Sequence, residues 1–448
     1  MKLKKTLIKN AKIVNEGTIF SGDILIEGEF IKQIDTSISA KSADVHVIDA
    51  EGKYVMPGAI DDQVHFREPG LTHKANIETE SKAAIAGGIT SFIEMPNTNP
   101  QTTTIEKLEE KFEIAAKTSS ANYSFMFGGT NDNLEEILKV DATTVAGLKL
   151  FLGSSTGNML VDDPKVLEKI FKSTNMVISV HCEDEATIKK NFQKHLEEYG
   201  EAIPIEKHPI IRSEEACYLS SSKAIALAKE TGARLHVFHV STGKETKLFS
   251  NKIPLKDKKI TAEVCVHHLW FSDKDYKEKG TAIKWNPAVK TEKDRAQLWK
   301  ALLDDRIDVI ATDHAPHTLE EKKNVYTKAP SGGPLVQHAL PAMLEMHHKG
   351  KISIEKIVEK MCHNPAILFQ VERRGYIKEG YFADLVIVDL NSPWTVKKDN
   401  ILYKCGWSPF EGSTFKSRIT HTILNGSLVY HNFKFPKVKA ARRLTFNR

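Results

Sequence analysis

Short apolar runs alternate with amphipathic stretches through the middle of the chain. We predict strands at Val55–His65, Ile89–Met95, Asn122–Phe127, Val145–Phe151, Val177–His181, Leu235–Val240, Ile260–Val266 and Val309–Thr312. Helical patterns lie between most of them, at Thr104–Ala116, Asp163–Phe171 and Ser213–Thr231. Ser213 suits the N-cap of the last helix, and Gly232 suits its end. Strands and helices in this alternation predict an eight-stranded β/α (TIM-like) barrel, with an open doubly wound sheet as the competing layout.

Both ends of the chain carry the pattern of short antiparallel strands instead. We predict strands at Thr6–Val14 and Ala383–Asp389, two short strands within Asp23–Ile34 that flank a Gly28-Glu29 turn, and a hairpin at Thr420–Tyr430. Asn425-Gly426 lies at the turn of that hairpin, and Asn-Gly suits the left-handed positions of a two-residue loop. The fold class is therefore α/β, with a small β-sandwich domain formed by both termini. We expect residues 1–55 and 371–448 to form the sandwich and residues 56–370 to form the barrel.

The composition narrows the class of protein. The chain has 448 residues, of which 41% are hydrophobic and 27% charged, which excludes a disordered, collagen-like or disulfide-scaffold protein. The longest stretch without a charged residue, Ala329–Leu344, contains three prolines and is shorter than the roughly 20 apolar residues of a membrane span. The five cysteines form no C-x-x-C pair, and no signal-peptide core follows the start of the chain. We expect a cytoplasmic protein.

The net charge of +5 is concentrated at one end of the sequence. The last 18 residues carry six Lys or Arg and no acid. A basic end of this kind is more often solvated than bound to nucleic acid. We therefore expect a small-molecule substrate and neither a nucleic acid nor a membrane as partner. A homodimer is one assembly that the sequence allows.

Polar residues recur at the carboxyl ends of the predicted strands. They are His65, Asn97, Lys149, His181, His239, His267, His268 and Asp313. In a β/α barrel these ends open onto one face, where active sites are built. A single histidine beside an apolar run is more often a hydrogen-bonded core residue than a ligand. Repetition at the same end of successive strands favours a site, and imidazole with carboxylate suits zinc or a similar divalent ion.

Lys149 has a different chemistry from the other residues of this set. An ammonium group has no lone pair, so a free lysine is no metal ligand at neutral pH. Lys149 could bind a metal only after reaction with carbon dioxide, which gives a carbamate. From the residue alone, a lysine with its amine in water is the favoured interpretation.

Eight segments, in chain order, form a more specific set of motifs. They are Pro57–Gly70, Met95–Thr98, Gly147–Phe151, His181–Glu183, His236–Ser241, Glu263–His268, Asn286-Pro287 and Ala311–Thr318. The most specific motifs of the set are Arg-Glu-Pro-Gly in the first segment and Asp-His-Ala-Pro-His in the last. This set resembles the dihydroorotases of the amidohydrolase superfamily and covers most of residues 55–341. The resemblance implies the reversible cyclisation of N-carbamoyl-L-aspartate to dihydroorotate, with loss of water, in pyrimidine biosynthesis.

The resemblance also implies a role for each site residue. His65 and Asp313 would be ligands of a first zinc and His181 and His239 ligands of a second, with a carbamylated Lys149 as the bridge between the ions. Asp313 would also be the catalytic acid and base. Arg67, Asn97 and His317 would hold the substrate carboxylate, and Asn286 would contact the substrate near its ring. The carbamate role for Lys149 replaces the solvated amine favoured above. The resemblance implies that the loop at Ala329–Gly332 closes over the ring with its backbone.

Gln63 departs from the family pattern, which usually has His at this position. A neutral amide oxygen is a weak ligand for zinc. The first metal is then held by His65, Lys149 and Asp313 alone, or is held weakly with Gln63, or is lost. A non-catalytic scaffold protein is one alternative on this ground. A hydantoinase or allantoinase is another, although Arg67 and His317 favour a substrate that carries a carboxylate.

Overall fold

Eight parallel strands confirm the predicted barrel in the computed structural model, which describes residues 5–39, 44–153 and 159–448. They are β6 (Ala59–Val64), β7 (Ile89–Glu94), β8 (Asn122–Gly128), β9 (Gly147–Phe151), β10 (Ile178–His181), β11 (Leu235–Val237), β12 (Ile260–Cys265) and β13 (Val309–Ala311), paired in this order. The first and last strands meet through side chains and one backbone bond. Thr312 Oγ1 donates to Asp61 Oδ2 at 2.6 Å, and His65 N donates to His314 O at 2.7 Å. These bonds bring the two edges of the sheet together.

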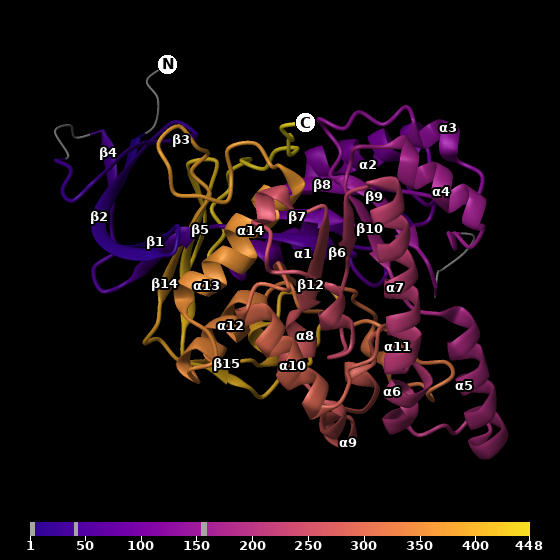
Figure 1. The fold of residues 1–448 in the computed structure, drawn as a ribbon. Coiled ribbons are helices and arrows are strands. Elements are labelled where there is room, and N and C mark those ends of the chain that lie inside the picture. Colours follow the sequence, from indigo (N-terminus) through magenta and orange to yellow (C-terminus); the bar gives the residue numbers. More distant parts are fainter. Residues whose placement is uncertain (1–4, 40–43, 154–158) are drawn as a thin grey trace.

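Helices surround the strands (Figure 1). They are α1 (Ile77–Ala86), α2 (Ile105–Thr118), α3 (Leu134–Ile137), α4 (Pro164–Ser173), α5 (Glu185–Tyr199), α6 (His208–Ile211), α7 (Glu214–Thr231), α8 (Val266–Trp270), α9 (Tyr276–Lys279), α10 (Glu292–Leu303), α11 (Leu319–Lys322), α12 (Ala339–His348), α13 (Ile354–Val358) and α14 (Asn364–Phe369). The N-caps of α2, α4 and α7 are Thr104, Asp163 and Ser213. Gly232 ends α7 with φ of 73°, so the predicted helix signals are confirmed.

The strands from both ends of the chain form a separate β domain beside the barrel (Figure 1). They are β1 (Lys5–Asn15), β2 (Thr18–Glu27), β3 (Phe30–Asp35), β4 (Val45–Asp49), β5 (Tyr54–Pro57), β14 (Leu385–Asp389), β17 (Arg418–Leu424) and β18 (Ser427–His431). A small ribbon of β15 (Trp394–Thr395) and β16 (Thr414–Phe415) lies apart from this sheet. The predicted hairpin turn is present, with φ of 45° at Asn425 and 73° at Gly426.

The prediction of a single strand at Val55–His65 is wrong. Its first residues belong to β5, which pairs with β1 and β14 in the terminal sheet, and the barrel strand β6 starts at Ala59. Gly58 lies between the two strands, and its N–H donates to Asp384 O at 2.8 Å. A Cβ at Gly58 would lie 2.1 Å from Thr90 Oγ1, so only glycine fits where the chain passes from one sheet to the other. An apolar pattern alone does not reveal this break, because both strands are buried.

Strand β14 shows how the two domains pack. Leu385 and Ile387 face a cluster that lies within the terminal sheet, whereas Val386 and Val388 belong to the large core shared with the barrel. Alternate residues of a strand point to opposite faces, so a strand buried on both faces becomes a continuous apolar run. The run Leu385–Val388 is therefore explained by burial on both sides. The β domain is attached to the barrel by a hydrophobic interface.

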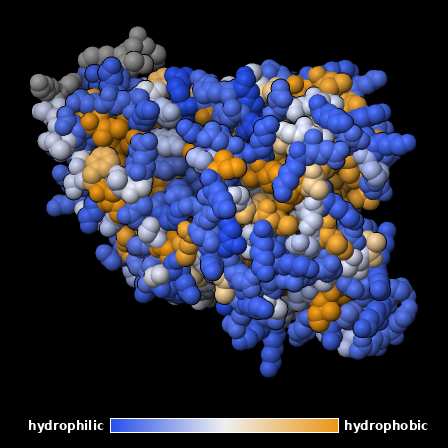
Figure 2. Space-filling model, in the orientation of Figure 1, coloured by the Kyte–Doolittle hydropathy of each residue, from blue (hydrophilic) through white to orange (hydrophobic). Residues whose placement is uncertain are grey.

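The surface is largely hydrophilic, with small separate apolar patches on the face shown in Figure 2. Within the described ranges, no helix combines the length and the apolar character needed to cross a bilayer. Arginines of the basic C-terminal segment bind the protein itself. Arg443 donates to both oxygens of Glu109 at 3.1 Å and lies 3.4 Å from the centre of the Phe112 ring. Part of the basic end is thus used to attach the chain to α2.

Candidate metal centre and active site

The carboxyl ends of the barrel strands surround a cavity of about 310 Å³. It is lined by all of the predicted site residues, His65, Arg67, Asn97, Lys149, His181, His239, Asn286, Asp313 and His317. Gln63, Trp285 and the loop at Pro330–Gly332 complete the lining. The structure therefore brings together residues that are separated by up to 252 positions in the sequence.

His65 and Asp313 form one pair of potential ligands. Nδ1 of His65 donates to Asn97 Oδ1 at 2.8 Å, which leaves the lone pair of a neutral ring on Nε2. Nε2 lies 3.1 Å from Asp313 Oδ1. Burial lowers the pKa of His65, which favours the neutral ring. Two acceptor atoms that face each other at this distance favour a bound cation, and Asn97 orients the ring for it.

His181 and His239 form a second pair. Glu183 is an acceptor, so His181 donates from Nε2 to Glu183 Oε2 at 2.9 Å, and its lone pair is on Nδ1. That Nδ1 lies 3.0 Å from His239 Nε2. Burial would raise the pKa of Glu183, but Arg212 and His181 lower it to about 2, so it remains a carboxylate. A histidine fixed by a carboxylate in this way is typical of metal ligands.

Lys149 lies within the barrel, not at its solvent-exposed edge. Its side chain is 1% exposed, and Nζ has no hydrogen-bond partner among the described residues. The rings of Phe238 and Phe151 lie 4.2 Å and 5.0 Å from Nζ. Burial lowers the pKa of Lys149 to about 7, so much of the amine is neutral at neutral pH. The interpretation of a solvated amine is wrong, because β9 directs the side chain into the cavity.

The two pairs of ligands and the buried amine fit a divalent cation. Neutral imidazoles and a carboxylate supply lone pairs, and each pair of donors converges on one place. Strain in the backbone is concentrated at the same residues. His239 has φ of 40°, Asp313 of 45° and Arg67 of 68°, in the left-handed region that favours glycine. Strain of this kind persists at functional sites, where the surrounding structure enforces it.

The other side of the cavity is positively charged. Arg67 donates from Nε to Pro316 O at 3.0 Å, and its Nη2 lies 3.0 Å from His317 Nε2. Lys74 Nζ lies 3.0 Å from His317 Nδ1. Burial, Arg67 and Lys74 keep the pKa of His317 well below its usual value. A planar guanidinium beside a neutral imidazole suits a ligand with a carboxylate group.

Asn286 and the loop at residues 330–332 lie above this side. The buried Oδ1 of Asn286 has no hydrogen-bond partner within the parts of the chain that the structure describes. It lines the cavity and is available to a ligand. Gly332 has φ of 127°, and a Cβ there would lie 2.4 Å from Ala315 O. Only glycine therefore allows the loop to approach the strand end this closely.

Lys322 is a functional residue that the sequence analysis missed. It is 1% exposed and donates to the carbonyl oxygens of Lys284, Pro330 and Gly332 at 3.2, 2.9 and 2.7 Å. It fixes two backbone groups of the loop that lines the cavity, so we regard it as a positioning residue. No pattern signalled this role, because Lys322 belongs to a run of charged residues that is typical of a solvated helix.

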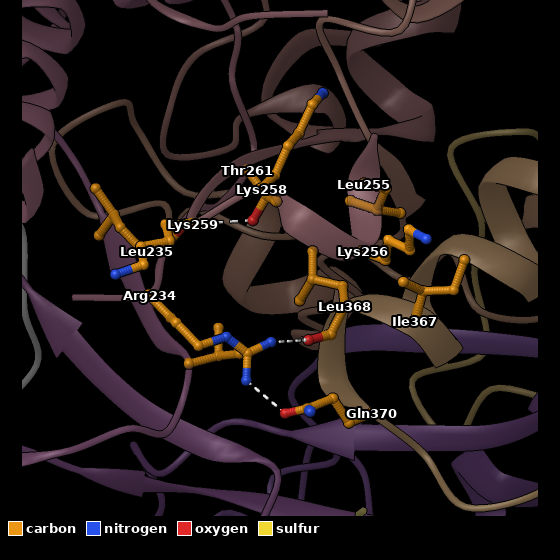
Figure 3. Close-up of a pocket in the computed structure, with 11 residues that line it drawn as sticks. Arg234, Leu235, Leu255, Lys256, Lys258, Lys259, Thr261, Ile367, Leu368 and Gln370 are labelled. Atoms are coloured by element: carbon orange, nitrogen blue, oxygen red, sulfur yellow. Dashed lines mark hydrogen bonds between the residues drawn. The ribbon is translucent and has the colours of Figure 1, made fainter. Parts of the chain in front are cut away.

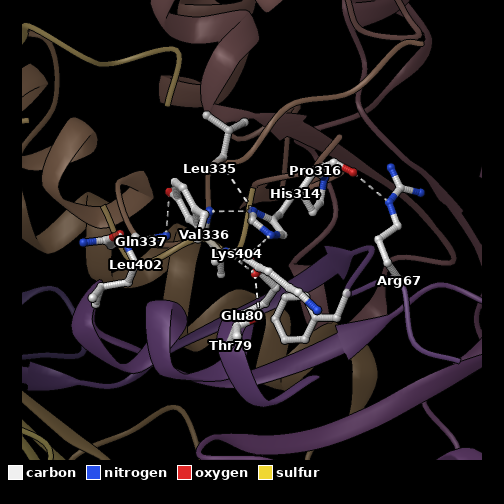
Figure 4. A network of polar contacts seen from close by, with 12 residues as sticks. Arg67, Thr79, Glu80, His314, Pro316, Leu335, Val336, Gln337, Leu402 and Lys404 are labelled. Carbon is white, nitrogen blue, oxygen red and sulfur yellow. Dashed lines mark hydrogen bonds and ion pairs between the residues drawn. The ribbon is translucent and has the colours of Figure 1, made fainter. Parts of the chain in front are cut away.

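His314 anchors the far end of the same loop (Figure 4). Its Nδ1 accepts from the backbone N–H groups of Leu335 and Val336 at 2.9 Å and 3.2 Å. Its Nε2 therefore donates to Glu80, at 2.8 Å. Glu80 also accepts from Lys404 N at 3.0 Å. Helix α1, the loop and the C-terminal part of the chain are thus linked beside Asp313.

Two further groups of potential ligands lie near the cavity. Cys265, His267 and His268 form one group, and Asp62, His236 and Glu263 form the other. His236 Nε2 lies 3.2 Å from Asp62 Oδ2 and 3.9 Å from Glu263 Oε2. Burial would lower the pKa of His236, but the two carboxylates raise it to about 9. The second group is therefore balanced by its own imidazolium, without a metal.

Comparison with known proteins shows the family of this chain. Residues 54–429 match the Amidohydrolase family. The dihydroorotase of Staphylococcus epidermidis is 34% identical over 96% of this chain and 100% of its own length. The dihydroorotase of Pyrococcus abyssi is 33% identical over 94% of each chain.

Solved structures show the same architecture. The L-hydantoinase (dihydropyrimidinase) from Arthrobacter aurescens superposes with a TM-score of 0.93 at 29% identity, over 98% of this chain and 99% of that chain. A D-hydantoinase from Thermus sp. superposes with a TM-score of 0.87 at 26% identity, over 98% of both. The hydantoinases share the fold, whereas the dihydroorotases share more of the sequence. This chain therefore belongs to the amidohydrolase family and, within it, to the group of the dihydroorotases.

Proposed function

We propose that this protein is a dihydroorotase, which interconverts N-carbamoyl-L-aspartate and dihydroorotate in pyrimidine biosynthesis. The proposal rests on one observation: the potential metal ligands line the same cavity as Arg67, His317 and Asn286. Relatives about one-third identical over nearly the whole chain, named as dihydroorotases, support it. Both reactants carry carboxylates, which the cationic side of the cavity would attract.

We propose two zinc ions as the metal content. His65 and Asp313 would hold one, His181 and His239 the other, and Lys149 would join both as a carbamate. The low pKa of Lys149, about 7, supports the last point, since only the neutral amine reacts with carbon dioxide. When bound, the metals would supply an activated water and polarise the reacting carbonyl group.

The residues of the chain then perform three tasks. Arg67 and His317 would bind the substrate carboxylate, and Asn286 Oδ1 would accept from a ring N–H. The loop fixed by Lys322 would cover the ring and exclude water. In the hydrolytic direction Asp313 would take the proton of the attacking water and give it to the ring nitrogen as the amide bond breaks. In ring closure it would move the proton the opposite way, from the ureido nitrogen to the departing oxygen.

Parallel assays of dihydroorotate, hydantoin and allantoin test the function. We expect dihydroorotate to be hydrolysed with a far higher kcat/KM than the other two. A preference for hydantoin would instead support the activity named for the structural neighbours. Protein that contains no metal after purification without chelator, and that turns over none of the three, would favour the scaffold interpretation of Gln63.

Gln63→His tests the departure from the family pattern. Gln63 is 2% exposed, and its Oε1 lies 3.8 Å from Cys265 Sγ. We expect the variant to bind the first metal about tenfold more tightly or better, because imidazole is a stronger zinc ligand than a neutral amide. Competition with a chromogenic chelator measures the affinity. Equal affinity in both proteins would show that position 63 does not contact the metal.

Arg67→Ala tests the cationic side of the cavity. We expect KM for dihydroorotate to rise by about 30-fold or more, because loss of a buried charged hydrogen bond costs roughly 2 kcal/mol or more. Metal content should stay unchanged, since the described side-chain hydrogen bonds of Arg67 go to Pro316 and His317 and not to a proposed metal ligand. Steady-state kinetics and elemental analysis measure the two effects. An unchanged KM would contradict the role.

A further inference from the structure

A second cavity lies at the opposite end of the barrel strands. It has a volume of about 330 Å³ and is located between α14, the short helix at Leu255–Asp257 and the amino ends of β10, β11 and β12. We call it the basal cavity. Figure 3 shows its basic residues Arg234, Lys256, Lys258 and Lys259. No acidic side chain is part of its described lining.

Most of this positive charge is not neutralised by the protein. Lys258 is the exception, since its Nζ lies 2.6 Å from Asp308 Oδ1. Arg234, Lys256 and Lys259 form no ion pair within the described ranges. Burial lowers the pKa of Arg234, and no neighbouring carboxylate offsets this effect. Lys259 donates only to a backbone carbonyl, Gly232 O, at 3.1 Å. Three like charges around one cavity repel each other, and a bound anion would relieve this repulsion.

Arg234 is fixed in a position to bind such an anion. Its Nη2 donates to Leu368 O at 2.7 Å, and its Nη1 donates to Gln370 Oε1 at 2.5 Å. A guanidinium has five N–H donors, so about three remain for a ligand. The side chain is already held by the end of α14, so binding costs little conformational freedom. Figure 3 shows both bonds at the lower edge of the cavity.

The rest of the lining is apolar except for Thr261 and Gln370. Leu235, Leu255 and Leu368 contribute to it. A cavity of about 330 Å³ is within the range of small-molecule sites. An anionic group beside Arg234, combined with an organic part on the leucines, matches these two surfaces. A guanidinium binds phosphate through two parallel hydrogen bonds, and lysines are also common phosphate ligands.

We propose that the basal cavity binds a small organic phosphate of about the size of a mononucleotide. The phosphate group lies against Arg234, while Lys256 and Lys259 add positive charge at the rim of the cavity, and the organic part lies on the leucine wall. The site is at the amino ends of β10 and β11, whereas His181 is the last residue of β10 and His239 lies two residues after β11. A ligand there does not compete with the substrate of the candidate active site.

Titration calorimetry of the metal-loaded protein tests the proposal with adenosine 5′-monophosphate as probe. We expect saturable binding that weakens with added salt, and binding of uncharged adenosine at least about tenfold weaker. The exposed double variant Lys256→Gln/Lys259→Gln should lose about tenfold or more in affinity, and Arg234→Gln at least as much. Lys252→Gln, an exposed lysine on the same segment outside the cavity, is the matched control and should bind as the parent does.

Three results would overturn the proposal. One is the absence of binding at millimolar probe. Another is equal affinity in the parent and the double variant. The third is loss of binding in Arg67→Ala, or competition of the probe with dihydroorotate, either of which would place the phosphate in the cavity at the carboxyl ends of the strands.

Discussion

Asp313→Asn is expected to lower kcat by about a thousandfold or more, since general acid–base catalysis contributes roughly 10²–10⁴ and the amide cannot accept the proton. Asparagine has nearly the shape of aspartate and keeps one oxygen toward His65, 3.1 Å away in the parent. Because an amide oxygen is a weaker zinc ligand than a carboxylate, the variant is assayed with zinc in excess, where the metal should remain bound and loss of turnover reports proton transfer. Rapid kinetics in both directions, together with elemental analysis, measure the effect.

A matched variant separates this effect from a general loss of negative charge. Asp304→Asn removes a carboxylate that pairs with Arg306 on the surface, at 2.8 Å, and should leave kcat within about twofold. If Asp313→Asn kept the parental kcat, Asp313 would not be the acid and base. If it lost the metal as well, the role in proton transfer would have to be tested with a variant that retains it.

Lys149→Ala is expected to remove most of the metal and, with it, activity to below about one-thousandth of the parent. The reason is that the two proposed metal sites, His65 with Asp313 and His181 with His239, would lose the group that joins them. Short carboxylic acids should restore part of the metal and of the rate, because they can occupy the space of the missing carbamate. Metal content per chain and kcat with and without propionate measure both effects.

Ser179→Ala is the control for truncation inside the barrel. Ser179 is directly opposite Lys149 in the pairing of β10 with β9, and it is fully buried. This variant should keep the metal. Full metal and full rate in Lys149→Ala would contradict a bridging carbamate. Loss of metal in both variants would point to a packing defect instead.

The sequence and the structure give different kinds of information about the proposed metal ligands. The sequence indicates His181 as a ligand because it lies at the end of an apolar run. The role of Glu183 in orienting His181 is visible only in the structure, where the two side chains form a hydrogen bond of 2.9 Å. Lys149 shows the reverse case. Its residue type alone favours a solvated amine, and the resemblance was needed to expect a buried one. The Lys149 side chain is buried because β9 packs within the complete barrel, and the residues next to Lys149 in the sequence do not reveal this packing.

Local signals were sufficient wherever the structure depends on neighbours in the chain. Ser213 and Gly232 delimit α7, and Asn425-Gly426 forms the turn of its hairpin, because capping and turn geometry involve only a few adjacent residues. The order of strands and helices likewise follows from hydrophobic periodicity. The sequence by itself therefore determined the barrel, the separate terminal domain and the identity of most residues that line the cavity.

Only the tertiary structure decided what depends on contacts between distant segments. The break at Gly58, the contact of Lys322 with Lys284 and the bonds of Arg234 to the end of α14 each involve residues far apart in the chain. The sequence alone does not distinguish an apolar run that is divided between two sheets from a single strand, or a lysine that is buried against a loop from an exposed one. The physical reason is that burial and hydrogen-bond partners are set by the packing of whole elements, so their consequences for charge and strain cannot be assigned before those elements are in place.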